Sequence, residues 1–155
     1  MKKNIEPAQG KLGILIVGVG GAVSTTLISG VLSVRKGLSQ PVGSITQMAT
    51  IKMQNGKEMP IKDIVPIADL KDIVFGGWDI FPENAYQAAV YAEVLKAKDL
   101  EPIRTELESI TPMKAAFDHN YAKRLNGTFI KDTQTRWDMA VSYTHLRAHE
   151  TGAYL

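Results

Sequence analysis

The chain has 155 residues, of which 45% are hydrophobic, and it contains no cysteine. A length of this order suits one domain with enough apolar residues for a core. Without cysteine, a disulfide framework, a thiolate zinc site and a cysteine nucleophile are all excluded. The 18 basic and 16 acidic residues are interspersed and give a net charge of +2. This balance provides no electrostatic reason to expect nucleic acid or an anionic membrane as a partner.

No segment of the sequence is long and apolar enough to cross a bilayer, because the apolar run at residues 12–17 is short and glycines follow it. The basic start at residues 1–3 lacks a secretory apolar core, since Glu6 and Pro7 interrupt the segment that follows. We therefore expect a soluble, cytoplasmic protein whose partner is a small molecule.

The first predicted element is a strand over residues 12–17, a continuous apolar run typical of a central parallel strand buried on both faces. Glycines at 18, 20 and 21 follow it. Apolar residues at helical spacing then predict a helix that ends at Gly37. The order of elements is thus strand, glycine turn and helix.

The next predicted unit is a hairpin. An extended segment over residues 43–53 precedes Asn55-Gly56, a dipeptide that readily supplies two positive-φ residues to a tight turn. A short strand over residues 58–61 returns, and Pro60 indicates that this strand lies at an edge.

A second buried strand is predicted over residues 72–75, ending in a glycine-rich turn, Gly76-Gly77-Trp78-Asp79. Trp78 is expected to anchor the core. Pro82 and Glu83 suit the first turn of a helix. The buried face of that helix is expected to comprise Ala85, Ala88, Ala89, Ala92 and Leu95.

A further helix is predicted to begin at Glu101-Pro102 and to end before Thr111-Pro112, with Ile103, Leu107 and Ile110 marking it. The alternation of strands and helices favours an α/β fold, with a Rossmann-like, mostly parallel sheet and flanking helices. The basic residues that follow the last predicted helix are expected to form a solvated face. They are Lys114, Lys123, Arg124 and Lys131.

The glycine turn has the chemistry of a dinucleotide site, which needs a tight turn and a helix N-terminus facing the diphosphate. Gly18 allows a sharp exit from the strand, and Gly20 removes a Cβ from the path of the phosphates. Hydroxyl donors follow nearby at Ser24, Thr25 and Thr26. A plain strand-to-helix turn is the alternative, because Val23 replaces the third glycine of the GxGxxG pattern.

Rossmann folds place an acidic residue about 20 residues after the glycines, to hold the ribose hydroxyls. Here that window contains only Arg35 and Lys36. Asp79 is the candidate in their place, because it follows another buried strand; the alternative is an N-cap or turn role.

Three blocks of the sequence closely resemble the myo-inositol-3-phosphate synthase family: GVGGAVSTT at 18–26, GSITQ at 43–47 and VFGGWDI at 74–80. The resemblance covers roughly residues 10–140. It implies an NAD-dependent isomerase that converts glucose 6-phosphate to myo-inositol 3-phosphate without net redox change. In that family NAD oxidises C5 of the sugar, enolisation and an aldol step close the ring, and NADH reduces the ketone.

The resemblance also assigns candidate cofactor-binding residues, which lie at the glycine turn and after the second strand. Many family members have two asparagines where this chain has Ala22 and Val23, so backbone donors must replace their side-chain amides. Asp79 matches the ribose-binding aspartate, and Ala115 is given no role. The full candidate set for NAD is Gly18, Gly20, Gly21, Ala22, Val23, Ser24 and Asp79.

The resemblance implies that the catalytic and phosphate-binding residues lie beyond this segment, in a longer homotetrameric protein. We therefore assign no catalytic residue here and expect an inactive fragment. Two other functions remain open from the residues alone: a non-catalytic NAD-binding sensor module, and a generic NAD-dependent dehydrogenase.

We divide the chain into an N-terminal arm (1–10), an incomplete NAD-binding domain (11–140) and a tail (141–155). Residues 141–151 can be reverse-translated into a transposase end with a library adapter, which indicates sequencing read-through. His145 and His149 in this tail are four apart, but no HExxH order or third ligand supports a metal site. His119 has no nucleophile partner, so a surface role is expected.

Overall fold

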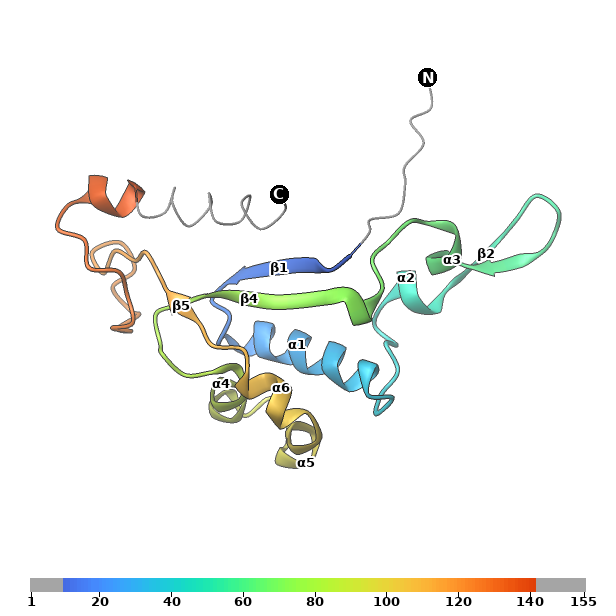
Figure 1. The fold of residues 1–155 in the computed structure, drawn as a ribbon, viewed down its shortest axis with the longest axis horizontal. Helices are drawn as coiled ribbons and strands as arrows, with labels where there is room; N and C mark the ends of the chain where they lie inside the picture. Colours follow the sequence, from blue (N-terminus) through green and yellow to red (C-terminus); the bar gives the residue numbers. More distant parts are fainter. Residues whose placement is uncertain (1–9, 142–155) are drawn as a thin grey trace, which may run out of the picture.

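The computed structural model describes residues 10–141 (Figure 1). Its main sheet has the strand order β1-β4-β5, with all pairs parallel. These strands are β1 (Leu12–Val17), β4 (Ile73–Asp79) and β5 (Met113–Lys114). A parallel bridge between Ala115 and Ile130 continues the sheet. The predicted α/β fold with a mostly parallel sheet is confirmed.

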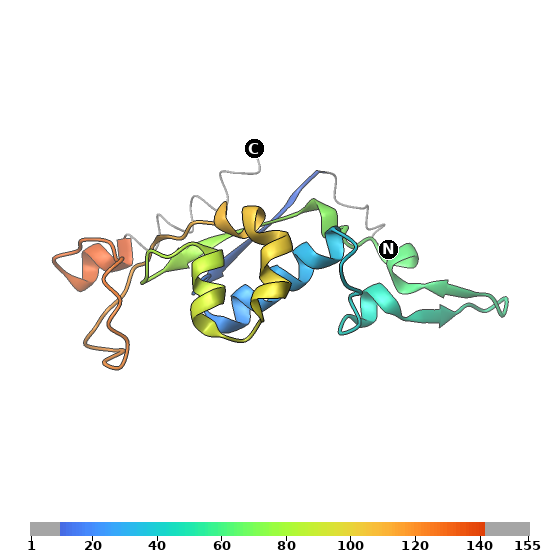
Figure 2. The same ribbon diagram turned by 90° about the horizontal axis from the view of Figure 1, so that it is seen from below.

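The helices of the main body all lie on one face of the β1–β4 pair (Figures 1 and 2). They are α1 (Ala22–Arg35), α4 (Ala85–Ala92), α5 (Ala97–Leu100), the 3-10 turn η2 (Glu101–Ile103) and α6 (Arg104–Glu108). Within residues 10–141, none of the helices is long and apolar enough to cross a membrane.

The core lies between the sheet and these helices. Phe75 of β4 and Ile28 and Leu32 of α1 are buried there, against Ile14 and Ile16 of β1. The small side chains of α4 let it pack closely on α1, and Ala85, Ala88 and Ala89 are buried as the alanine pattern predicts. From the last helical region Leu100, Ile103 and Leu107 complete the core.

The position predicted for β1 is wrong for the described residues. β1 lies at the end of the strand order, and Leu15 and Val17 are 42% and 74% exposed on the face that the helices do not cover. Val74 of β4 is 47% exposed on the same face. The reason is tertiary: the described helices of the main body pack on the other face of the sheet, and β2 and β3 pair only with each other among the described strands.

The predicted glycine turn at residues 76–79 is also wrong. Gly76 and Gly77 lie inside β4, paired with Leu15 and Ile16, and the strand continues to Asp79. A Cβ on Gly77 would collide with the carbonyl group of Ile16. Glycine is therefore present because the two strands approach closely, and the chain turns only after Asp79.

The hairpin projects from the body (Figure 1) and contains β2 (Thr50–Lys52) and β3 (Glu58–Pro60). The chain reverses next to the predicted Asn55-Gly56, but the predicted tight turn with two positive-φ residues is wrong, because only Gly56 of the two has a positive φ, of 80°. Met53 accepts a hydrogen bond from Gly56 N and donates one to Lys57 O, the pattern of a turn followed by a glycine bulge. Pro60 ends β3, which has β2 as its partner.

Short helices flank the hairpin: α2 (Ile45–Met48), α3 (Ile61–Ile64) and the 3-10 turn η1 (Leu70–Asp72). α2 contradicts the extended segment predicted over residues 43–53. One helical turn is shorter than the window over which helical periodicity can be recognised, so sequence pattern alone misses it.

α4 begins three residues later than predicted, because Asn84 caps it. The Asn84 side chain accepts from Gln87 N at 2.9 Å, and Gln87 Oε1 accepts from Asn84 N at 3.2 Å. Pro82 and Glu83 consequently precede the helix. The last helical region also begins earlier than predicted, at Ala97.

The side chains assigned to core and surface lie largely as expected. Trp78 is 6% exposed and packs with Ile80 and Ala115, so the predicted anchor is confirmed. His119 is exposed and contacts Phe117 edge-on. Of the predicted basic face Lys114, Lys123 and Arg124 are exposed, whereas Lys131 is half-buried.

Candidate functional site

The carboxyl ends of β1 and β4 meet at one edge of the sheet. Val17 pairs with Trp78, so the glycine loop that follows β1 lies beside the end of β4. Gly18, with a φ of 81°, makes the sharp exit from the strand that was predicted for it. Gly18 N and Val19 N both donate to Trp78 O, at 2.8 and 3.2 Å. The loop is therefore attached to β4 before α1 begins.

Asp79 lies against this loop. Its Oδ2 accepts a hydrogen bond from Gly20 N at 2.8 Å, and its Oδ1 accepts one from Phe81 N at 3.2 Å. The residue is 8% exposed, so the two N–H groups offset part of the cost of burying its carboxylate. The structure thus brings together the two parts of the candidate site, Gly20 and Asp79.

The N-terminus of α1 supplies the open donors at this edge. Because a helix starts without acceptors for its first N–H groups, those of Ala22, Val23 and Ser24 have no intrahelical partner. Gly21, the N-cap, makes no side-chain cap, and the first turn of this fully described helix contains no acidic residue. These N–H groups and the helix dipole favour an anion.

The hydroxyls predicted as further phosphate donors are instead bonded to the backbone. Ser24 Oγ donates to Gly18 O at 2.8 Å, and Thr25 Oγ1 donates to Gly21 O at 3.0 Å. Thr26 Oγ1 donates to Ala22 O at 2.7 Å. Since a hydroxyl has one hydrogen, these side chains can only accept from a ligand in this arrangement. Backbone N–H groups are the donors that remain in this arrangement, and a donor role of these hydroxyls toward a ligand stays a prediction.

A pocket of about 480 Å³ opens between the glycine loop and α4. Its lining consists of Gly20, Asp79, Phe81, Glu83, Gln87, Ala88 and Tyr91. Two carboxylates and two aromatic side chains belong to this described lining, which includes no lysine or arginine. The carboxylates can accept hydrogen bonds from hydroxyl groups of a ligand, and the aromatic side chains can pack on a flat apolar group. The same carboxylates would repel an anionic group placed in this pocket.

Sequence reasoning missed five of these lining residues as parts of a site, of which Ala88 was predicted only for the buried helix face. Glu83, Gln87 and Tyr91 are four residues apart, so they follow one face of the α4 region, and Phe81 comes directly after the Asp79 turn. That spacing immediately after Asp79 is the signal that could have identified them.

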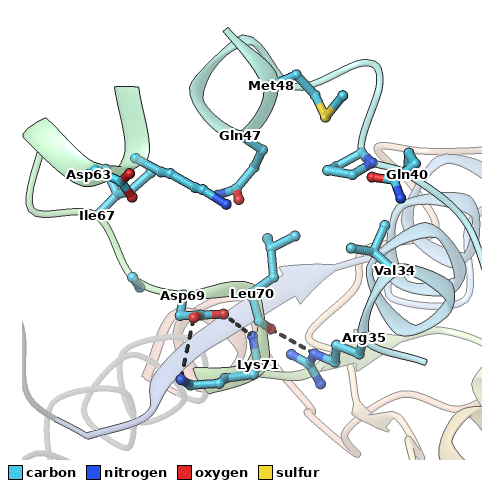
Figure 3. A pocket seen from close by; sticks show the side chains of 13 residues that line it. Val34, Arg35, Gln40, Gln47, Met48, Asp63, Ile67, Asp69, Leu70 and Lys71 are labelled. Carbon is cyan, nitrogen blue, oxygen red and sulfur yellow. Dashed lines mark hydrogen bonds and ion pairs between the residues drawn. The ribbon is translucent and has the colours of Figure 1, made fainter. Parts of the chain in front are cut away.

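A second pocket, of about 550 Å³, lies at the opposite end of β4, between α1 and the hairpin segment (Figure 3). Arg35 Nε donates to Leu70 O at 2.7 Å, and a second guanidinium nitrogen donates to Ile73 O. The backbone N–H of Lys71 holds the pKa of Asp69 below its usual value, and the two side chains form an ion pair at 3.4 Å. The Arg35 hydrogen bonds fasten η1 and the start of β4 to α1, and the Asp69–Lys71 pair lies within the η1 region. Neither belongs to the glycine-loop site.

Comparison with known proteins identifies the family of this chain. Residues 12–149 match the NAD-binding model described as myo-inositol-1-phosphate synthase. The chain belongs to the myo-inositol-1-phosphate synthase family. The matched part is the NAD-binding portion of the family, so NAD is the cofactor that the fold accommodates. The match runs past residue 141, and the read-through origin of the tail stays a prediction.

Individual members of the synthase family are also similar to this chain in sequence. The chain is 67% identical over 139 residues to inositol-3-phosphate synthase 1 of Bacteroides thetaiotaomicron, covering 90% of this chain and 32% of that protein. It is 36% identical over 132 residues to inositol-3-phosphate synthase 1 of Oryza sativa subsp. japonica, covering 76% and 26%. The chain therefore spans about a third or less of these curated relatives.

The fold is also similar to that of a solved inositol-3-phosphate synthase. The structure resembles that of inositol-3-phosphate synthase from Caenorhabditis elegans with a TM-score of 0.71 and 26% identity. That alignment covers 90% of this chain and 30% of the nematode synthase. Within residues 10–141 of this synthase-family chain, no group of three or more acidic, histidine or cysteine side chains could hold a metal ion. His145 and His149 lie outside the described residues.

Proposed function

We propose that this chain binds the adenosine diphosphate half of NAD within a longer protein that isomerises glucose 6-phosphate to myo-inositol 3-phosphate. The observation that carries the proposal is the position of Asp79. Its carboxylate lies at the end of the strand next to β1, at hydrogen-bond distance from the glycine loop. A Rossmann fold binds one nucleotide to each βαβ half, and β1, α1 and β4 form one such unit.

The diphosphate fits the start of α1. The N–H groups of Ala22, Val23 and Ser24 face outward from the helix N-terminus, and a negative ligand there gains from the helix dipole. The absence of side-chain amides at positions 22 and 23 leaves this binding to the backbone.

The ribose fits Asp79, whose oxygens each accept one backbone hydrogen bond and retain capacity for a hydroxyl donor. Glu83 adds a second carboxylate to the pocket. A phosphate on the ribose would be repelled by both groups, so we expect preference for NAD over NADP. Phe81 and Tyr91 offer apolar surface to the adenine ring.

When bound, NAD supplies reversible hydride transfer, which permits an isomerisation without net redox change. The residues described here bind and orient the cofactor, and we assign the reacting groups to the part of the longer protein outside this chain. Support comes from the relatives, which are named inositol-3-phosphate synthases and are about three times as long. The uncovered face of β1 also supports a longer protein, because both faces of a parallel sheet are normally covered.

We extend the proposal to assembly and location. Glucose 6-phosphate is the substrate and a homotetramer is the working form of the full-length protein. The cytoplasm is the compartment, which the lack of cysteine permits.

The test replaces Ala22 by proline. Proline is tolerated at the first helical position, and Gly21 already has a compatible conformation, with φ −64° and ψ 153°. Ala22→Pro removes one N–H donor without breaking a helical hydrogen bond. We expect calorimetry to show NAD affinity about tenfold lower, as for loss of a charge-assisted hydrogen bond, with an unchanged melting temperature.

The matched control is Ala22→Ser, which keeps the N–H group and should bind NAD as the wild type does. Failure of the wild-type chain to bind NAD or ADP would refute the nucleotide site. For the full-length protein, turnover of glucose 6-phosphate with catalytic NAD is expected. Accumulation of NADH would identify a dehydrogenase, and binding without turnover a sensor.

A further inference from the structure

Gly20 has no side chain at a point where one would meet Asp79. A Cβ built on Gly20 would lie 3.1 Å from Asp79 Oδ2 and 3.4 Å from the Cβ of Ala88. The φ angle of Gly20 is not positive, unlike that of Gly18, so its backbone conformation does not require glycine. The space that glycine leaves is therefore next to the carboxylate and to α4.

The backbone N–H of Gly20 is likewise engaged. It donates to Asp79 Oδ2 at 2.8 Å, so this donor is not available to a phosphate in the same arrangement. Through Oδ1 the same carboxylate also accepts from Phe81 N, which fixes the turn that leads to α4. Asp79 thus joins the glycine loop to the next turn by two backbone hydrogen bonds.

We propose that Asp79 is a positioning residue for the glycine loop, and that Gly20 lacks a side chain in order to admit the Asp79 carboxylate and not the diphosphate. The proposal rests on the NAD site argued above and deepens it. In the general account of Rossmann folds the second glycine allows close approach of the pyrophosphate. Here the diphosphate approaches the N-terminus of α1. The contact between Gly20 and Asp79 sets the position of that N-terminus.

The test is a double-mutant cycle with Gly20→Ala and Asp79→Ala in the full chain, because coupling between the two sites is the distinguishing quantity. NAD is one ligand. Inorganic diphosphate is the other, since it has no ribose and reports on the α1 terminus alone. Amide NMR shifts of residues 22–24 follow binding of either ligand when affinity is low.

Asp79→Ala is expected to weaken binding of inorganic diphosphate as well as NAD, because the loop loses its attachment. Gly20→Ala should lower NAD affinity about tenfold in the wild-type background and by less than about twofold in the Asp79→Ala background. An equal loss in both backgrounds would show that the Cβ obstructs the diphosphate directly, and would overturn the proposal. Unchanged diphosphate binding in Asp79→Ala would overturn the positioning role.

Amide hydrogen exchange of the wild-type chain tests the proposal without any variant. The Gly20 N–H should be protected before NAD is added, and the addition should change its protection little. Protection that arises only with NAD would mean that the ligand, and not Asp79, is its acceptor. A wild-type chain that binds neither NAD nor diphosphate would refute the proposed function instead, so the two failures are distinguishable.

Discussion

Gly20 N donates a 2.8 Å hydrogen bond to the carboxylate of Asp79, although 59 residues separate the two in the sequence. The contact exists because β1 and β4 are parallel neighbours whose carboxyl ends reach the same edge. The hairpin region lies between α1 and β4 in the sequence, so the acidic residue at the end of β4 comes much later than the usual place after the glycines.

Gly77→Ala should prevent correct pairing of β1 with β4. Its Cβ would collide with the Ile16 carbonyl group, which is backbone and cannot rotate away. We expect a loss of about 3 kcal/mol or more in the free energy of unfolding, at the upper end for overpacking. Urea denaturation measures it.

The control for this variant is Gly76→Ala, whose Cβ would lie an ordinary 3.4 Å from Leu15 Cδ2. It should cost less than about 1 kcal/mol, since alanine also restricts the unfolded chain. Similar stability of the two variants would contradict the close approach at Gly77.

Val23→Asp should raise stability and lower cofactor affinity at the same time. Val23 is 84% exposed at the second position of α1. A carboxylate there stabilises the helix by about 0.5 kcal/mol through its dipole. The same charge repels a diphosphate, so NAD affinity should fall about tenfold. Thermal melts and calorimetry measure the two effects, and Val23→Asn, which adds an amide donor and no charge, should not lower the affinity.

Asn84→Ala should destabilise the chain by about 1 kcal/mol, because it removes the N-cap of α4 and its bond to Gln87 N. The measurement is the shift of the urea midpoint. Glu83→Ala is the control, since Glu83 precedes the helix and is exposed. If Glu83→Ala proved the more damaging change, α4 would begin earlier, as the sequence pattern had indicated.

Glu106→Gln should weaken the link between α1 and α6 in a pH-dependent way. Lys36 Nζ is 2.6 Å from Glu106 Oε1, and this hydrogen bond holds the pKa of Glu106 below its usual value of 4.5. A lowered pKa in the folded state stabilises the fold above the usual value, and this contribution is lost as pH falls through the folded pKa.

The wild type should therefore exceed Glu106→Gln in stability at neutral pH and converge with it in acid. The difference should be at most about 1 kcal/mol, because both side chains are 38% exposed and solvent screens the pair. Urea denaturation at several pH values measures it. A difference that persists unchanged into acid would show that the carboxylate charge is not its source.

The sequence by itself determined the elements whose signal is local. β1 is a continuous apolar run of strand length, and the apolar positions in α1 and the alanine face of α4 repeat with the period of a helix. The glycine loop and the family blocks belong to this class, because residues adjacent in sequence carry them.

Only the tertiary structure decided what depends on a distant neighbour. Gly76 and Gly77 predict a turn when they are considered alone, and they extend a strand because Leu15 and Ile16 of β1 pair with them. The hydroxyl of Ser24 could serve a ligand, and it bonds Gly18 because the loop folds back. Asp79 reaches Gly20 through sheet pairing, which no spacing along the chain specifies. Contacts of this kind depend on how strands and helices pack, and local patterns contain no record of that arrangement.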